Sequence, residues 1–302
     1  MDFKKSFLTL LLSVVISSKV FSQQQIYSYS QYADNLTPIN SAYAMLDKNG
    51  SISLLGNRQF VGIEDAPSSL MFNGNLPIRS INAATGIYLL NDLTPLVRQL
   101  EINAYFAKSI QITADQYLSV SINGGMRNYA ANYTALDASD PEFMTNVRDT
   151  KPNIGFGIMY YSEKFYLGLS MPQLTFGALA TTEVSQTNYL KSHYYFSGAY
   201  IFGIAEDFKL KTATLVSYAK DRPVITRVTG TIYLNEKLGI GVAYSSEKLI
   251  AGMLSVNFNN FKVGYGYETG ASGSKNTGGI NNARNEINFS YRFRKNITPK
   301  LL

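Results

Sequence analysis

The chain has 302 residues and a single His, and because it has no Cys, disulfides and thiol chemistry are excluded. Its formal net charge of +6 is weak and the basic residues form no run, so we do not expect a nucleic-acid partner. With 22 Tyr, 17 Phe, 23 Gly and near-neutral mean hydropathy, it is either a soluble β protein or a β-barrel that hides a lipid-facing surface by alternation.

Residues 1–22 are predicted to be a cleaved secretory signal peptide. Lys4 and Lys5 precede an apolar run over residues 7–16, and Val20, Phe21 and Ser22 form an acceptable cleavage site. An uncleaved membrane anchor is the alternative, but the run is shorter than the roughly 18 residues that a spanning helix needs.

Residues 23–50 differ from the rest of the chain. They are rich in Gln, Ser, Tyr and Asn, contain Pro38 and show no regular period. We therefore predict an N-terminal periplasmic or lumen segment that lies outside the sheet and packs under it or inside it.

From residue 51 onward, short alternating runs separated by turn residues recur to residue 294, which predicts a sheet of fourteen strands. The expected strands cover residues 51–60, 68–78, 82–91, 97–112, 117–129, 153–161, 165–173, 194–204, 208–219, 224–234, 238–245, 249–258, 261–268 and 286–294. Residues 295–302 are predicted to be a periplasmic C-terminal tail.

The last strand has the pattern of a transmembrane β-strand. Ile287, Phe289, Tyr291 and Phe293 fall on one side of an extended chain, and polar residues fall on the other. A tilted strand of roughly 9–11 residues crosses a bilayer, and this run is about that long. A soluble sheet could show the same alternation, so the strand alone decides nothing.

The lengths of the connections favour the membrane. Three are long, over residues 130–152, 174–193 and 269–284, and they follow predicted strands 5, 7 and 13, all odd. Both termini of a single-chain barrel face the periplasm, so connections after odd strands are extracellular and should be the long ones. We predict an all-β fold, a transmembrane antiparallel β-barrel of about 14 strands in the outer membrane.

Many Gly, Ala and Ser residues fall on the non-apolar faces of these strands, which suits a narrow or plugged lumen. Scattered charges are also expected to face inward, and these candidate lumen residues are Arg58, Lys262, Glu268, Glu286, Arg292 and Arg294.

Residues suited to catalysis or metal binding are sparse, so we expect no enzyme activity, cofactor or metal. His193 is the only histidine, and its neighbour Ser192 belongs to no catalytic motif. Asp137, Asp140 and Glu142 lack the dense ligand run and Gly turn of a helical calcium loop, and Asp140 before Pro141 is better explained as a turn.

Several segments, in their order and spacing, are similar to those of a known family. They are residues 29–32 (YSQY), 40–44 (NSAYA), 57–62 (NRQFVG), 66–67 (AP), 140–143 (DPEF), 157–161 (GIMYY), 165–172 (FYLGLSMP) and 285–293 (NEINFSYRF). Together they resemble the PorP/SprF family of type IX secretion outer-membrane proteins. The resemblance implies a fourteen-stranded barrel similar to fatty-acid-transporter-type barrels.

Two classes of function follow. The resemblance implies a non-enzymatic barrel of the type IX secretion and gliding machinery, in contact with outer-membrane lipid and other secretion components. Such a barrel would dock, secrete or retain a secreted type IX substrate or surface adhesin. The alternative is a porin or transporter for small or hydrophobic solutes. Aromatic residues dominate protein–protein hot spots, so the candidate docking residues are Tyr129, Tyr133, Phe143, Phe176 and Tyr189, unless they only pack the loops together.

Overall fold

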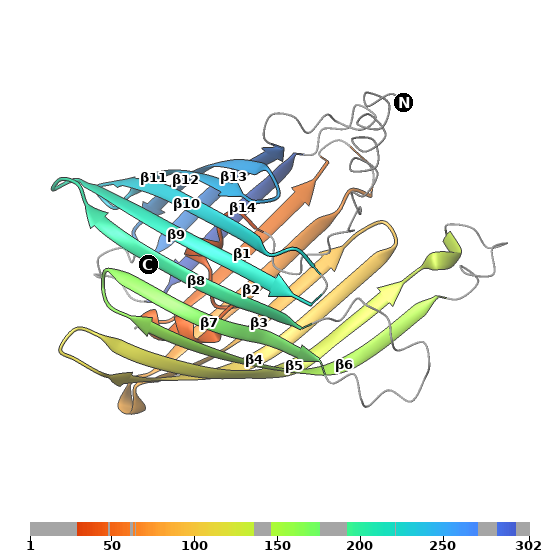
Figure 1. Ribbon diagram of the computed structural model, residues 1–302, viewed down its shortest axis with the longest axis horizontal. Coiled ribbons are helices and arrows are strands. Elements are labelled where there is room, and N and C mark those ends of the chain that lie inside the picture. Colours follow the sequence, from red (N-terminus) through yellow and green to blue (C-terminus); the bar gives the residue numbers. More distant parts are fainter. Residues whose placement is uncertain are drawn as a thin grey trace, which may run out of the picture.

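The structure, a computed structural model, describes residues 29–47, 49–60, 63, 65–135, 146–175, 192–220, 222–270 and 283–293 (Figure 1). The predicted signal peptide and the predicted C-terminal tail lie outside these residues. Across the described ranges, none of the helices is both long enough and apolar enough to cross a membrane.

Fourteen antiparallel strands form a closed barrel, in which each strand pairs with its neighbours in sequence and β1 pairs with β14. The predicted fold is therefore confirmed. The strands are β1 (Ser51–Gln59), β2 (Ser68–Ile78), β3 (Ala83–Leu93), β4 (Val97–Gln111), β5 (Tyr117–Ala131), β6 (Val147–Tyr161), β7 (Phe165–Thr175), β8 (His193–Gly203), β9 (Phe208–Ala219), β10 (Ile225–Leu234), β11 (Leu238–Ser245), β12 (Leu249–Phe258), β13 (Phe261–Gly270) and β14 (Arg284–Arg292). Short 3₁₀ turns lie at η3 (Arg79–Ile81) and η4 (Tyr133–Ala135).

The largest difference from the predicted boundaries lies in β6, which begins at Val147 rather than at residue 153. The sequence Asp-Thr-Lys-Pro before residue 153 has the composition of a turn. It is nevertheless extended because β5 continues to Ala131, whose register partner is Val147. Pro152 points outward, and pairing with a long neighbour overrides the local turn preference.

Side chains alternate between an apolar outer face and a polar lumen. On β14, Ile287 is 60% exposed and Phe289 is 39% exposed, whereas Glu286 and Asn288, which alternate with them, are buried. The same alternation recurs on β11, where Ile240, Val242 and Tyr244 point outward. The closing strand thus has the orientation that its sequence predicts, with its apolar side away from the lumen.

The two ends of the barrel differ. At one end, here called the turn end, β1 begins and β14 ends, and even strands connect to odd strands through short turns. In the turn between β10 and β11, Asn235 and Glu236 both adopt positive φ, as tight hairpins require. The opposite end, here called the loop end, carries the long connections after β5, β7 and β13, in agreement with the predicted parity.

Residues 29–47, here called the plug, lie inside the barrel (Figure 1). They include two short 3₁₀ helices, η1 (Tyr32–Asp34) and η2 (Ser41–Leu46). Nearly every plug residue is buried, which a segment lying under the barrel or along its outside would not be. The plug runs from β14 near the loop end, where Ser30 meets Glu286, to the turn end, where β1 begins.

Candidate functional site

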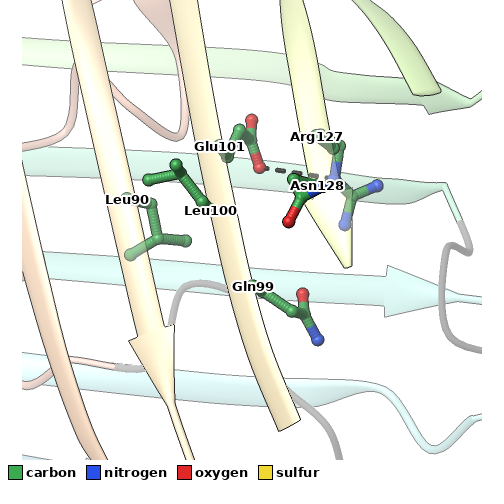
Figure 2. A pocket seen from close by; sticks show the side chains of 6 residues that line it. All are labelled: Leu90, Gln99, Leu100, Glu101, Arg127 and Asn128. Carbon is green, nitrogen blue, oxygen red and sulfur yellow. Dashed lines mark ion pairs between the residues drawn. The ribbon is translucent and has the colours of Figure 1, made fainter. Parts of the chain in front are cut away.

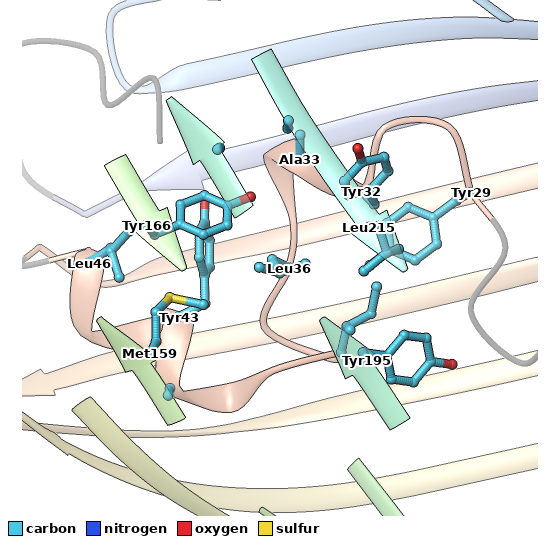
Figure 3. Close-up of a cluster of buried hydrophobic side chains, with 14 of the residues drawn as sticks. Tyr29, Tyr32, Ala33, Leu36, Tyr43, Leu46, Met159, Tyr166, Tyr195 and Leu215 are labelled. Atoms are coloured by element: carbon cyan, nitrogen blue, oxygen red, sulfur yellow. The ribbon is translucent and has the colours of Figure 1, made fainter. Parts of the chain in front are cut away.

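The plug fills the lumen by apolar packing at its centre. Leu36 and Ile39 are fully buried, and the Tyr43 ring meets the edge of the Tyr166 ring with centroids 5.6 Å apart. Figure 3 shows Leu36 and Tyr43 between inward residues of several strands, including Tyr195 of β8. Apolar wall residues that face inward thus bury their surface against the plug rather than against lipid.

The carboxylate of Glu286 on β14 fixes the first residues of the plug. It accepts hydrogen bonds from the Ser30 backbone N–H at 2.8 Å, the Ser30 hydroxyl at 2.5 Å and the Gln31 backbone N–H at 3.3 Å. Successive backbone N–H groups that point at one anion form a nest, and hydrogen bonds to an ionised acceptor are stronger than neutral ones. The plug therefore compensates a fully buried wall charge.

Asp34 in η1 forms a buried charge cluster with two wall lysines. Its Oδ1 lies 2.8 Å from Lys262 Nζ of β13 and 3.5 Å from Lys211 Nζ of β9. Lys211 also donates to the Ala33 carbonyl at 2.7 Å, and its side chain is only 2% exposed. The two ammonium groups beside it favour the ionised form of the Asp34 carboxylate.

Asn40 attaches the plug to β6 and β7. Its Nδ2 donates to the Ile158 carbonyl at 3.1 Å and to the Leu169 carbonyl at 3.3 Å, and its Oδ1 accepts from Ala42 N–H to cap η2. Gly157 and Gly168 leave the space for this side chain. A Cβ at Gly157 would overlap Asn40 Oδ1, and one at Gly168 would lie 2.8 Å from Asn40 Nδ2.

Two glycines of β13 likewise leave space for side chains at the start of the plug. A Cβ at Gly264 would overlap Gln31 Oε1, and one at Gly266 would lie 2.9 Å from Ser30 Oγ. These inward glycines are thus recesses for particular plug side chains.

Near the turn end, wall side chains bind the main chain of η2. Asn75 Nδ2 donates to the Ala44 carbonyl at 3.2 Å, and Ser119 Oγ donates to the Ala42 carbonyl at 3.0 Å. The last plug residue, Asp47, forms an ion pair of 3.8 Å with Arg292 of β14, whose side chain is 30% exposed. This ion pair is longer and more exposed to solvent than the ion pairs of Asp34.

Towards the loop end, the wall pairs its own charges. Glu101 of β4 lies 3.5 Å from Arg127 of β5 and accepts from Gln173 Nε2 at 2.6 Å and from Asn103 Nδ2 at 2.7 Å. Figure 2 shows this ion pair beside a small pocket whose lining also includes Leu90. The pocket is narrow and belongs to the wall network.

A second wall network joins β10, β13 and β14. Arg227 pairs with Glu268, and Arg284 lies 3.4 Å from the other oxygen of the same carboxylate. All three side chains are largely buried, so each charge is compensated across strands rather than by water.

The sequence-predicted lumen residues fall into three groups. Lys262, Glu268, Glu286 and Arg292 lie in the lumen and form the contacts above. Arg294 lies outside the described residues. Arg58 is a correction: it is exposed on the outward face of β1, and its Nη2 donates to the Ile63 carbonyl at 3.3 Å.

The predicted docking aromatics do not form a surface cluster within the described residues. Tyr129 is only 3% exposed and points inward near the end of β5, with its hydroxyl 3.3 Å from that of half-buried Tyr133. The two hydroxyls are therefore within hydrogen-bond distance of each other. Phe143, Phe176 and Tyr189 lie outside the described residues.

His193 is buried and stacks on Tyr195, with ring centroids 6.3 Å apart. Among the described residues, no three His, Cys, Asp or Glu side chains come close enough together to hold a metal ion.

The sequence patterns assigned no lumen contact to Asp34, Asn40 or Lys211. For Lys211 a signal existed, because it alternates with the outward residues Leu210 and Thr212 on a predicted strand. For Asp34 and Asn40 the segment has no period, so nothing local indicated their partners.

Residues 21–291 match the family described as type IX secretion system membrane protein PorP/SprF. The chain belongs to this family. The expected relationship is confirmed, and the family together with the barrel places the protein in the outer membrane. No curated protein matches the sequence.

Among solved structures, the chain is similar to outer-membrane barrels. Acinetobacter baumannii Omp33 is 9% identical, with a TM-score of 0.46, and 82% of this chain and 99% of that chain are covered. The Pseudomonas putida toluene transporter TodX is 8% identical, with a TM-score of 0.46 and coverage of 89% and 95%. A TodX variant described as a monoaromatic hydrocarbon channel is 10% identical, with a TM-score of 0.49 and coverage of 86% and 94%.

Several segments that resemble PorP/SprF sequences meet inside the barrel. Residues 29–32 and 40–44 belong to the plug, and residues 157–161, 165–172 and 285–293 supply the Gly157 and Gly168 recesses and Glu286. In this PorP/SprF protein, much of the family-like sequence therefore specifies how the plug sits in the wall.

Proposed function

We propose that this PorP/SprF barrel holds a partner protein at the outer membrane, and that it neither conducts small solutes at rest nor turns over a substrate. The partner would be a secreted type IX substrate or a surface adhesin. The observation that supports the proposal most directly is the filled lumen, in which the plug is buried and compensates the wall charges Lys211, Lys262 and Glu286.

We infer that such a partner binds at the loop end. Its connections after β5, β7 and β13 are the longest of the barrel, and loops placed by a rigid scaffold commonly carry binding residues. The outward apolar face is suited to lipid, and the turn end has short hairpins.

The test compares a deletion strain with strains that carry restored genes. The deletion should abolish surface retention of one secreted protein and leave permeability to small solutes unchanged. The wild-type gene should restore retention. A gene in which residues 136–145 are replaced by a short Gly-Ser linker should restore the folded barrel without restoring retention.

A matched control shortens the turn end, where residues 205–206 between β8 and β9 are removed. This variant should restore retention fully. The proposal is wrong, and the transporter alternative right, if the deletion abolishes uptake of a solute and leaves every surface protein in place.

A further inference from the structure

The inward charges of the barrel wall divide into two sets. One set pairs within the wall: Arg127 with Glu101, and both Arg227 and Arg284 with Glu268. The other set pairs with the plug: Lys211 and Lys262 with Asp34, Arg292 with Asp47, and Glu286 with the N–H groups of Ser30 and Gln31. Only the second set would lose these partners if the plug left the lumen.

The cationic members of the second set lie close together near the turn end. Lys211 is the fourth residue of β9, Lys262 is the second residue of β13, and both reach the same Asp34 oxygen. Tyr233 of β10 adds its ring 5.5 Å from Lys262 Nζ. Two ammonium groups held this close and largely out of water need an anion between them.

We propose that Lys211 and Lys262 form an anion-binding constriction of the lumen, and that Asp34 of the plug occupies it and keeps the barrel closed. When Asp34 leaves, the site takes a small anion. Barrels of eight strands are filled by their own side chains, whereas barrels of 16–18 strands leave an aqueous channel. A fourteen-stranded barrel without its plug lies near the second case, so the two lysines would line water and favour anions.

The plug resembles a bound peptide in how it is held. Besides its apolar packing, its polar contacts are a nest on Glu286, the Asp34 ion pairs, the Asn40 amide and a few main-chain hydrogen bonds, all formed with the wall. Removing one partner of a buried ion cluster strongly destabilises the state that contains it, because the remaining charges are left uncompensated. Loss of the Asp34 charge should therefore favour the unplugged state.

The experiment uses the full mature chain in planar lipid bilayers with unequal KCl concentrations on the two sides. The wild type should stay closed. Asp34→Asn should raise the open probability by on the order of a hundredfold or more, with a reversal potential that shows preference for chloride. Asp47→Asn removes the other acid of the plug, whose ion pair is longer and more exposed, and should stay mostly closed.

Adding Lys211→Met and Lys262→Met to Asp34→Asn tests the electrostatic cause. The triple variant contains no uncompensated charge at this position, and apolar replacement of a complete buried ion cluster is commonly tolerated. It should close again. The proposal is overturned if Asp34→Asn stays closed, if its openings show no anion preference, or if the triple variant stays as open as Asp34→Asn.

A reversible cross-link distinguishes release of the plug from a damaged barrel. The chain has no Cys, and a Cβ at position 266 would lie 2.9 Å from Ser30 Oγ, close to the separation of a Cβ from the far sulfur of a disulfide. Ser30→Cys with Gly266→Cys, added to Asp34→Asn, should be closed when oxidised and open after reduction. Equal current in both states would mean that conduction needs no movement of the plug, and the proposal would fail.

Discussion

At the scale of single residues, inward glycines decide where the plug can lie. Gly157 and Gly168 leave space for Asn40, and Gly264 and Gly266 leave space for Gln31 and Ser30. Each recess is matched by a polar plug side chain that contacts the wall there. Because a barrel interior packs to near-crystalline density, a single added methyl group in a recess must displace the plug side chain.

Gly157→Ala should therefore destabilise the plugged barrel by about 1–3 kcal/mol, the usual range for overpacking. Thermal unfolding of the detergent-solubilised protein measures the effect. Gly230→Ala is the matched control, because a Cβ there meets nothing within 4 Å and faces outward.

Adding Asn40→Ala to Gly157→Ala should cost less than the sum of the two single changes, because the overlap disappears with the amide. Additive effects would show that the alanine at position 157 does not act through a contact with Asn40.

Each strand has one face towards lipid and one face towards the lumen, and consecutive residues point alternately to the two faces. On β14, Phe289 points outward, whereas Ser290 points inward with Lys262 as its register partner on β13. A charge on the lipid side of a barrel strand is costly near the bilayer midplane and much less costly in the lumen.

Phe289→Asp should accordingly reduce the folded fraction, with a cost of up to a few kcal/mol. Ser290→Asp should be tolerated, because the added carboxylate lies on the lumen side near a lysine. The two variants are compared by the mobility of unheated samples in detergent gels. Equal loss of folded protein from both variants would contradict the assignment of faces.

At the scale of the whole molecule, the closed ladder and the even strand count put both ends of the barrel wall at the turn end. In an outer-membrane barrel this end faces the periplasm, so the loop end faces the exterior. Ser246, between β11 and β12, is exposed at the loop end, and Glu163, between β6 and β7, is exposed at the turn end.

In a chain without native Cys, Ser246→Cys should react with a membrane-impermeant maleimide on intact cells. Glu163→Cys should react only after the outer membrane is made permeable, because the reagent must reach the periplasm. Labelling of intact cells at position 163 but not at position 246 would reverse the orientation.

The number of strands, the direction in which most of them face and the lengths of the connections follow from the sequence alone. These properties are local, because alternation has a period of two residues and turn residues interrupt it within the same stretch. The alternation misled where the interior is itself apolar. On β1, Leu54 points to lipid and Leu55 is buried against the plug, so two adjacent apolar residues conceal the alternation that would have placed Arg58 outside.

What fills the lumen follows only from contacts between distant parts of the folded chain. Asp34 meets Lys211 and Lys262, and Ser30 meets Glu286, across 177, 228 and 256 positions of the chain. The plug has no period because its side chains match recesses and charges on many strands, and that match exists only after the barrel has closed. Strand faces follow from neighbours in sequence, whereas the buried charge pairs follow from neighbours in space.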